Sequence, residues 1–95
     1  MSKKPAPKET TVAKYNRIQD AVEALGPWSQ VDNRAIRAAR VLAAARAEGY
    51  VFRCSPLEVA DFMGQMPYWN QGPSNYLDVA LGLSIILKNY QIKEN

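Results

Sequence analysis

The sequence contains no histidine and a single cysteine among its 95 residues, and these shortages exclude most catalytic and metal chemistry. A typical zinc site needs four Cys or His ligands, and Ser-His-Asp or Cys-His catalysis needs a histidine. The glycines Gly64, Gly72 and Gly82 lack the spacing of a nucleotide-binding loop. We therefore expect a protein that is not an enzyme and that uses neither a metal nor a cofactor.

Long apolar runs are absent as well. No stretch approaches the roughly 20 apolar residues that span a bilayer, and the first residues do not have the pattern of a signal peptide. The single thiol, Cys54, cannot close an internal disulfide, which favours a reducing compartment. It lies close to Phe52 and has no histidine as a base, so we expect an inert buried thiol. These features predict a cytoplasmic protein without membrane contact.

Basic residues are concentrated in the first half of the chain. The first 48 residues carry nine basic and five acidic side chains, a net charge of +4, whereas the rest carry three and four, a net charge of −1. Residues 1–10 contain Lys3, Lys4 and Lys8 with almost nothing apolar, a composition typical of disorder. We expect a disordered basic tail followed by a single helical domain over residues 11–93.

Hydrophobic periodicity and capping residues predict four helices in this domain. Gly26 and Pro27 end the first, because glycine tolerates a left-handed cap and proline cannot continue a helix. The run Ser55-Pro56-Leu57-Glu58 is typical of a helix start, since serine and glutamate can each accept from the other's backbone N–H. Residues 50–54 favour an extended segment, at most a short strand. The predicted helices cover residues 12–25, 34–48 with Asp32 or Asn33 as cap, 56–63, and Ser74 as cap to about residue 90.

Two of these helices have faces that spacing can assign. In the second helix, small apolar residues share one side and three arginines share the other. We expect the small residues to face the core and the arginines to face solvent. The fourth helix is apolar around most of its circumference, which predicts the buried centre of the fold. The predicted inner face of the second helix consists of Ile36, Ala39, Leu42 and Ala43.

The order of these elements resembles the winged-helix variant of the helix-turn-helix domain. Residues 56–64 look like the first helix of such a motif and residues 77–92 like its second, within a resemblance that covers roughly residues 33–92. It implies a mainly α, small four-helix domain with a winged-helix-like core, whose later helix meets the DNA major groove. By this resemblance, Asn75, Tyr76 and Asp78 would contact nucleic acid, with Ser74 at the start of the helix.

The three arginines of the second helix form the cluster that best suits a polyanion. Arg34, Arg37 and Arg40 repeat every three residues, so they form a ridge that can meet successive phosphates. The tail lysines would add to this basic surface. The alternative is a solvated helix face that contacts no partner.

A second candidate surface is the loop over residues 65–73. Met66, Tyr68 and Trp69 place large apolar groups where loops usually carry polar ones, so they can stack on bases or anchor a protein partner. Alternatively, the loop folds back as a lid on the core, because a small domain needs every large side chain. Trp28 has the same two interpretations, with core packing favoured.

Two functions follow from these surfaces. The first is a small non-catalytic nucleic-acid-binding regulator or accessory factor. The alternative is a protein-binding inhibitor, adaptor or assembly factor, for instance of phage or mobile-element type, that uses the aromatic loop. Self-association through the apolar fourth helix would give a homodimer. Arginines and Trp69 on one continuous face would favour nucleic acid, and their placement on opposite faces would favour a protein partner.

Overall fold

The described part of the chain contains four α-helices and no strand, which confirms the expected mainly α class. The computed structural model describes residues 10–94, with side chains as far as residue 87. The predicted tail lysines Lys3, Lys4 and Lys8 lie outside the described residues. The winged-helix-like arrangement of the core stays a prediction. In chain order the elements are α1 (Thr11–Ala24), the 3₁₀ turn η1 (Trp28–Gln30), α2 (Arg34–Ala47), α3 (Pro56–Met63), the 3₁₀ turn η2 (Tyr68–Asn70) and α4 (Pro73–Glu94).

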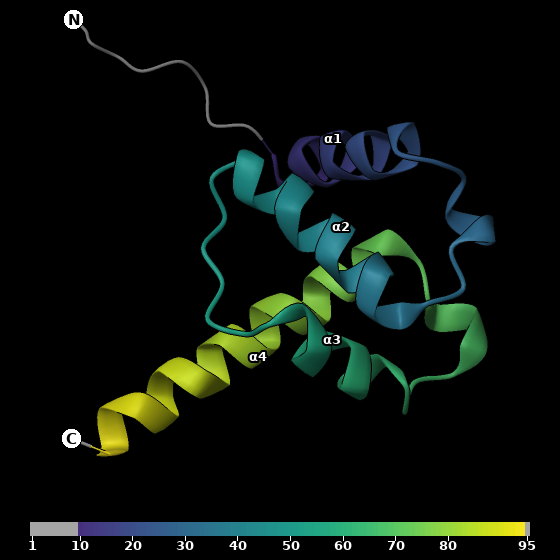
Figure 1. Cartoon of the computed structure of the whole chain (residues 1–95). Helices are drawn as coiled ribbons and strands as arrows, with labels where there is room; N and C mark the ends of the chain where they lie inside the picture. Colours follow the sequence, from purple (N-terminus) through teal and green to yellow (C-terminus); the bar gives the residue numbers. More distant parts are fainter. Residues whose placement is uncertain (1–9, 95) are drawn as a thin grey trace, which may run out of the picture.

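Helix α2 lies at the centre of the packing and contacts the other three helices. Figure 1 shows α1 above α2, with α3 and α4 below it. Apolar side chains from all four helices therefore meet in one core, together with a thiol from the segment between α2 and α3. The core consists of Ile18, Val22, Ala38, Val41, Leu42, Ala45, Cys54, Val59, Met63, Tyr76, Leu77 and Ala80.

Side-chain caps begin two of the helices where local signals predict them. Asn33 caps α2, because its side-chain oxygen accepts a hydrogen bond from the backbone N–H of Ile36 at 3.1 Å. At α3 the predicted capping box is present. Ser55 Oγ accepts from the Glu58 N–H at 3.2 Å, and the Glu58 carboxylate accepts from the Ser55 N–H at 2.7 Å. These bonds satisfy donors that the first turn of a helix leaves without partners.

Helix α4 begins one residue before its predicted cap. The sequence predicts Ser74 as the cap, and this prediction is wrong, because Pro73 is already the first residue of the helix. The carbonyl of Gly72 accepts hydrogen bonds from the N–H groups of Asn75 at 3.1 Å and Tyr76 at 3.2 Å. Proline suits the first helical position, since no N–H donor is needed there.

The buried face of α2 differs from the predicted one. Leu42 is buried as expected, but Ile36 is 47% exposed, and Ala39 and Ala43 are exposed too. Successive helical residues are turned by about 100°, so a small error of phase exchanges buried and exposed alanines. Packing against three helices decides that phase, and spacing within one helix does not reveal it. The residues of α2 that are buried are Ala38, Val41, Leu42 and Ala45.

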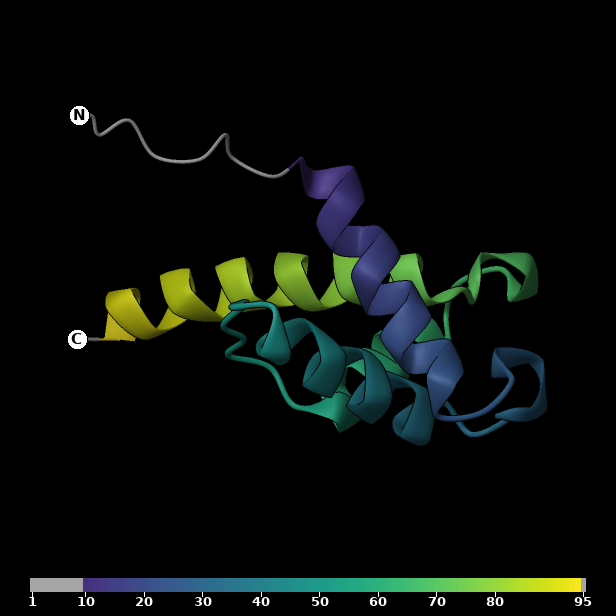
Figure 2. The same ribbon diagram turned by 90° about the horizontal axis from the view of Figure 1, so that it is seen from above.

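Helix α4 is buried along one side only, which corrects the prediction that it forms the buried centre of the fold. Tyr76, Leu77 and Ala80 are buried, whereas Ile85 and Ile86 are 62% and 61% exposed. The helix is longer than the elements it packs against, and Figure 2 shows its C-terminal part running past them. Within the described residues, none of the helices combines the length and hydrophobicity needed to traverse a bilayer.

Two polar contacts fasten α1 across the fold. The Tyr15 hydroxyl donates to the Asp78 carboxylate of α4 at 2.7 Å. Arg17 pairs with Glu48, the residue after α2, at 2.7 Å between Nη2 and Oε1. Hydrogen bonds from Arg17 hold the pKa of Glu48 below its usual value. Both contacts join residues far apart in sequence, so they fix where α1 lies on the other helices.

Candidate nucleic-acid interface

The indole of Trp28 forms the floor of the candidate site and connects η1 to the loop before α4. Its Nε1 donates to the backbone carbonyl of Gln71 at 2.8 Å. The ring meets that of Tyr76 edge to face, with centroids 5.4 Å apart and planes at 83°. This geometry brings the positive edge of one ring to the negative face of the other. Trp28 packs against the core, as its sequence context favours.

Arg37 lies over this indole. Its guanidinium carbon is 4.8 Å from the centroid of the Trp28 ring, a cation–π distance. Arg37 Nη2 also donates to the Trp28 backbone carbonyl at 3.1 Å. Two independent contacts therefore hold the Arg37 side chain against η1, at the edge of the core.

The predicted solvent-facing arginine ridge is wrong for two of its three members. Arg34 is exposed, but Arg37 and Arg40 are half-buried. Arg37 Nε and Arg40 Nη1 are buried without a hydrogen-bond partner. The aliphatic stems of these arginines cover apolar surface, and the contacts of Arg37 with Trp28 offset part of the cost of burying its guanidinium. Arg34 is the member of the ridge most open to a partner.

Tyr76 is a core residue, and the prediction that it contacts nucleic acid is therefore corrected. Its side chain is 0% exposed. The hydroxyl donates to Gln71 Oε1 at 3.1 Å, and Gln71 Nε2 donates to the Met63 carbonyl at 2.8 Å. Burial raises the pKa of the Tyr76 hydroxyl, against the opposing charge of nearby Arg37. This chain of hydrogen bonds joins α3, the following loop and α4.

The sequence of the loop between α3 and α4 suits either a contact for a partner or a lid on the core, and the exposure of its side chains distinguishes the two. Tyr68 and Trp69, in η2, are 85% and 81% exposed, so neither acts as a lid on the core. Met66 is half-buried and packs against the core, so it is the lid residue. Tyr68 and Trp69 are available to a partner in a way that Met66 is not.

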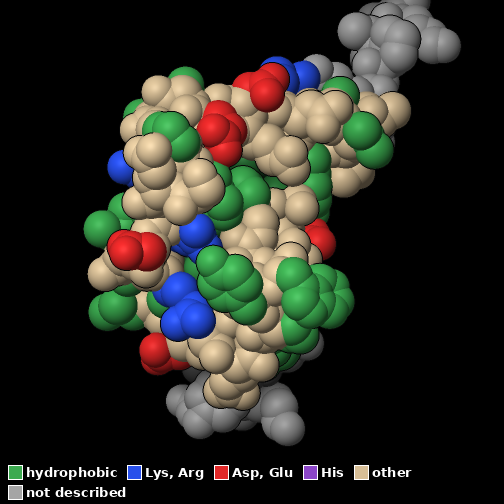
Figure 3. All heavy atoms as spheres, turned by 90° about the vertical axis from the view of Figure 1, so that its right-hand side faces the viewer, with side chains coloured by type: hydrophobic (Ala, Val, Ile, Leu, Met, Phe, Trp, Pro, Cys, Tyr) green, Lys and Arg blue, Asp and Glu red, His purple; other side chains and the backbone are tan. Residues whose placement is uncertain are grey.

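Two of the three arginines, Arg34 and Arg37, border the same hollows of the surface as the exposed aromatics, whereas Arg40 lines neither hollow. Arg37, Tyr68 and Trp69 line one of them together with Trp28. Arg34, Arg37 and Tyr68 line the adjoining one. Figure 3 shows this side of the molecule, where blue Lys and Arg side chains lie beside green hydrophobic ones. We call the surface formed by Arg34, Arg37, Tyr68 and Trp69 the arginine-aromatic face.

The first turns of α4 contribute little to this face. Asn75 is half-buried, and its side-chain oxygen lies near Gly72, which lines the same hollow as Trp69. Asp78 is exposed but accepts the hydrogen bond from Tyr15. Of the three residues that the winged-helix resemblance nominates, Tyr76 is buried, Asp78 is bonded to Tyr15, and Asn75 lies at the margin of the arginine-aromatic face.

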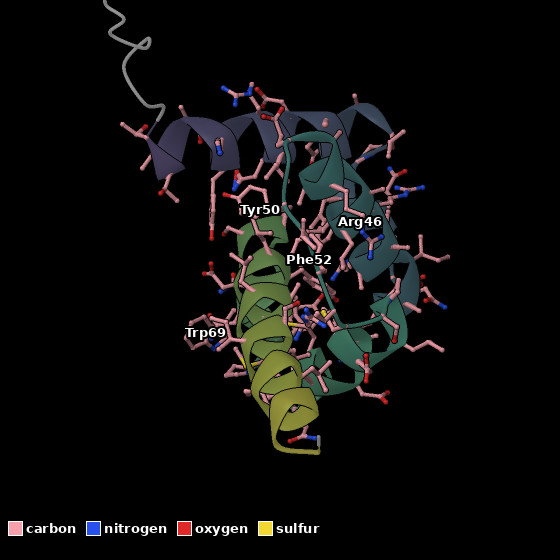
Figure 4. The ribbon with its side chains drawn as sticks, turned by 90° about the vertical axis from the view of Figure 1, so that its left-hand side faces the viewer. Arg46, Tyr50, Phe52 and Trp69 are labelled. Atoms are coloured by element: carbon pink, nitrogen blue, oxygen red, sulfur yellow. The ribbon has the colours of Figure 1, made fainter. Side chains whose placement is uncertain are left out.

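A separate cluster of cations and aromatic rings lies elsewhere on the molecule. The Tyr50 and Phe52 rings are stacked with centroids 6.2 Å apart, Lys14 Nζ lies 5.6 Å from the Tyr50 centroid, and Arg46 lies 5.7 Å from that of Phe52. Figure 4 shows Arg46 beside Phe52 and far from Trp69. Sequence reasoning missed this cluster. The signal was the two-residue spacing of Tyr50 and Phe52 in an extended segment, which turns both rings to one side.

Comparisons with protein-family models, with characterised proteins and with solved structures give no match for this chain. Among the described residues, no three or more Cys, Asp or Glu side chains gather in a way that could hold a metal ion. The class that the structure defines is a small all-α domain. Function has to be inferred from its surfaces.

Proposed function

We propose that this protein binds nucleic acid through the arginine-aromatic face, as a small regulatory or accessory factor. One observation carries the proposal: Arg37 and Trp69 line a single hollow, and Arg34 and Tyr68 line the hollow next to it. Cationic and stacking side chains thus share one continuous surface. Arginines neutralise phosphates, and exposed aromatic rings stack on bases, which is the combination that single-stranded nucleic acid requires.

The solvent exposure of the two aromatic side chains favours binding of unpaired bases over binding of an intact duplex. Tyr68 and Trp69 are more than four-fifths exposed and follow each other in the 3₁₀ turn η2. Base stacking needs a free ring face, which bases inside a duplex do not offer. The arginine contacts would position the strand, and the stacking contacts would tolerate any base.

Recognition of DNA base edges by the first turns of α4 has less support than binding through the arginine-aromatic face. Tyr76 is buried and Asp78 is bonded to Tyr15, which leaves Asn75 as the half-buried candidate for a base edge. A recognition helix normally presents several side chains of its first turns to the major groove. The proposed interface therefore centres on α2 and η2.

The second candidate function is binding of a protein, as an inhibitor, adaptor or assembly factor. Trp, Tyr and Arg dominate the energetics of protein interfaces, and here they are neighbours. Asp32 lines the hollow that contains Arg34, so the surface also offers a negative charge that repels phosphate and suits a protein partner. A partner captured after nuclease treatment, and lost on Trp69→Ala, would establish this function.

Fluorescence polarisation with labelled oligothymidylate and with a duplex of equal length, over a series of salt concentrations, tests the nucleic-acid proposal. We expect tighter binding to the single strand. Trp69→Ala should weaken it by about 5- to 150-fold, the effect of losing one stacked base. Arg34→Ala should reduce the slope of log K against log salt by about 0.7, the value for one phosphate contact.

Arg46→Ala is the matched control for Arg34→Ala. It removes the same charge from the other end of α2, where the side chain lies over Phe52 and away from Trp69. If both variants lose the same affinity, binding depends on the net charge of the protein alone. That result would contradict the proposed binding surface. Absence of salt-dependent binding at low salt would reject the proposal and favour a protein partner.

A further inference from the structure

The outer side of α4 is an exposed apolar crest that no other described element covers. Ile85 and Ile86 are 62% and 61% exposed, and Gly82 is exposed on the same side of the helix. Extended exposed apolar surface marks interaction sites on soluble proteins. The crest lies apart from the arginine-aromatic face, so the inference drawn from it does not rest on nucleic-acid binding.

Gly82 stands in the middle of this crest. Glycine inside a helix is destabilising relative to alanine, and it is usually explained by a neighbour that leaves no room for a side chain. Here a Cβ at position 82 would meet no atom within 4 Å. Nothing within the described fold explains the glycine, whereas a second helix crossing closely at this point would.

Two hollows of opposite charge flank the crest. On the α3 side Phe62, Val79, Leu83 and Ile86 line an apolar channel bordered by acids, which we call the acidic groove. On the other side Val51, Leu81, Ile85 and Arg53 line what we call the Arg53 groove. The charged residues that line the acidic groove are Glu58, Asp61 and Asp78.

The opposite charges lie at the same level along α4. The backbone N–H of Arg53 donates to Ser84 Oγ at 2.9 Å, which fixes Arg53 near the middle of the helix. Glu58 and Asp61 share their hollow with Leu83 and Leu87, one turn or less away. The charge on one flank of α4 is therefore complementary to the charge on the other flank at the same level of the helix.

We propose that two copies of this protein form a dimer through α4, with the two helices parallel and crest against crest. In a parallel pair the two-fold axis runs along the helices and brings opposite flanks together. The acidic groove of each copy then faces the Arg53 groove of the other, and the isoleucines fill the apolar floors. An antiparallel pair would place acid against acid, because its axis lies across the helices.

Sedimentation equilibrium over a wide range of protein concentrations tests the dimer. We expect a monomer–dimer equilibrium that Ile86→Glu weakens by on the order of tenfold or more, since it buries a charge at the centre of the interface. Leu57→Glu is the matched control, because Leu57 is 66% exposed on α3 and lines neither groove. Circular dichroism confirms that both variants are folded.

A charge exchange tests the parallel arrangement. Arg53→Glu should weaken the dimer by about three- to tenfold, and Asp61→Arg introduced into that variant should restore it. Wild-type protein that remains monomeric at all concentrations overturns the proposal, as does a dimer that Ile86→Glu leaves intact. Strengthening by Asp61→Arg alone, with no effect of Arg53→Glu, would show an antiparallel pair and overturn the stated arrangement.

Discussion

The guanidinium carbon of Arg37 lies 4.8 Å from the centre of the Trp28 ring, and Arg37 Nη2 donates to the carbonyl of the same tryptophan. These contacts make an arginine of the predicted binding ridge part of the packing. Its charge is held where a partner can reach it, while its stem covers the edge of the core. Arg37 therefore has two roles: it stabilises the fold, and it belongs to the proposed binding surface.

Arg37→Ala should accordingly lower the free energy of unfolding by about 2 kcal/mol. The cation–π contact and the charged hydrogen bond are each worth on the order of 1–2 kcal/mol, and removal of the unpartnered Nε offsets part of the loss. Urea denaturation measures the change. Arg34→Ala, at an exposed position, should stay within about 0.5 kcal/mol. Equal effects of the two substitutions would contradict a structural role for Arg37.

Tyr76→Phe should destabilise the fold by about 1–3 kcal/mol, because it leaves the buried Oε1 of Gln71 without its donor. The ring and its contact with Trp28 are retained, so the change isolates the hydroxyl. Tyr68→Phe removes the same group from a side chain that is 85% exposed and should have almost no effect. If the two substitutions shift the urea midpoint alike, the hydrogen bond to Gln71 does not stabilise the fold.

The stability of the protein should fall at alkaline pH. Burial, and then the hydrogen bond to the Asp78 carboxylate, raise the pKa of Tyr15 well above its ordinary value. The unfolded chain therefore loses this proton first, near pH 10. Protonated Tyr15 contributes its full share to the free energy of unfolding below that pH. This share is lost as the pH rises from there toward the pKa of Tyr15 in the folded protein. The expected slope is up to about 1.4 kcal/mol per pH unit.

Urea unfolding of wild type and Tyr15→Phe between about pH 8 and pH 11, on either side of the ordinary tyrosine pKa, measures this effect. The variant cannot ionise at this position, so its stability should decline less steeply. Tyr76, whose pKa is also raised, is present in both proteins, so its effect cancels in the comparison. Parallel pH profiles would show that Tyr15 does not lose its proton more readily on unfolding.

Cys54 should resist thiol reagents until the protein unfolds. Its side chain is 4% exposed, and Sγ lies 3.5 Å from the Ala80 carbonyl oxygen. Because a reagent cannot reach a buried thiol, modification requires opening of the fold. The rate of reaction with an aromatic disulfide should rise with urea along the unfolding curve. Rapid labelling of the native protein would contradict the burial of this thiol.

Much of the secondary structure can be predicted from this sequence because its signals act within a few residues. The capping box of Ser55 and Glu58 begins α3 as predicted, and α1 ends just before Gly26, whose φ of 139° few other residues adopt. Ser74 is the exception. Proline at position 73 could start α4 by itself, so the best capping side chain nearby was not needed.

The candidate site is only partly predictable. Arg34, Tyr68 and Trp69 belong to the proposed face and can be identified from composition and spacing. The burial of Tyr76, and the use of Arg37 to cover Trp28, depend on which elements meet. No pattern within α2 or α4 shows that η1 and the loop before α4 come together through the bond from Trp28 to Gln71.

The sequence by itself determined the all-α class, most helix ends and the exclusion of histidine-dependent chemistry, because each follows from local propensity or from the residues available. Only the tertiary structure decided which side of α2 is buried, how far α4 extends beyond its neighbours, and that Arg37 and Trp69 line one hollow. These properties depend on contacts between residues distant along the chain. A helix buries the side that its neighbours cover, and its own sequence specifies that side only approximately.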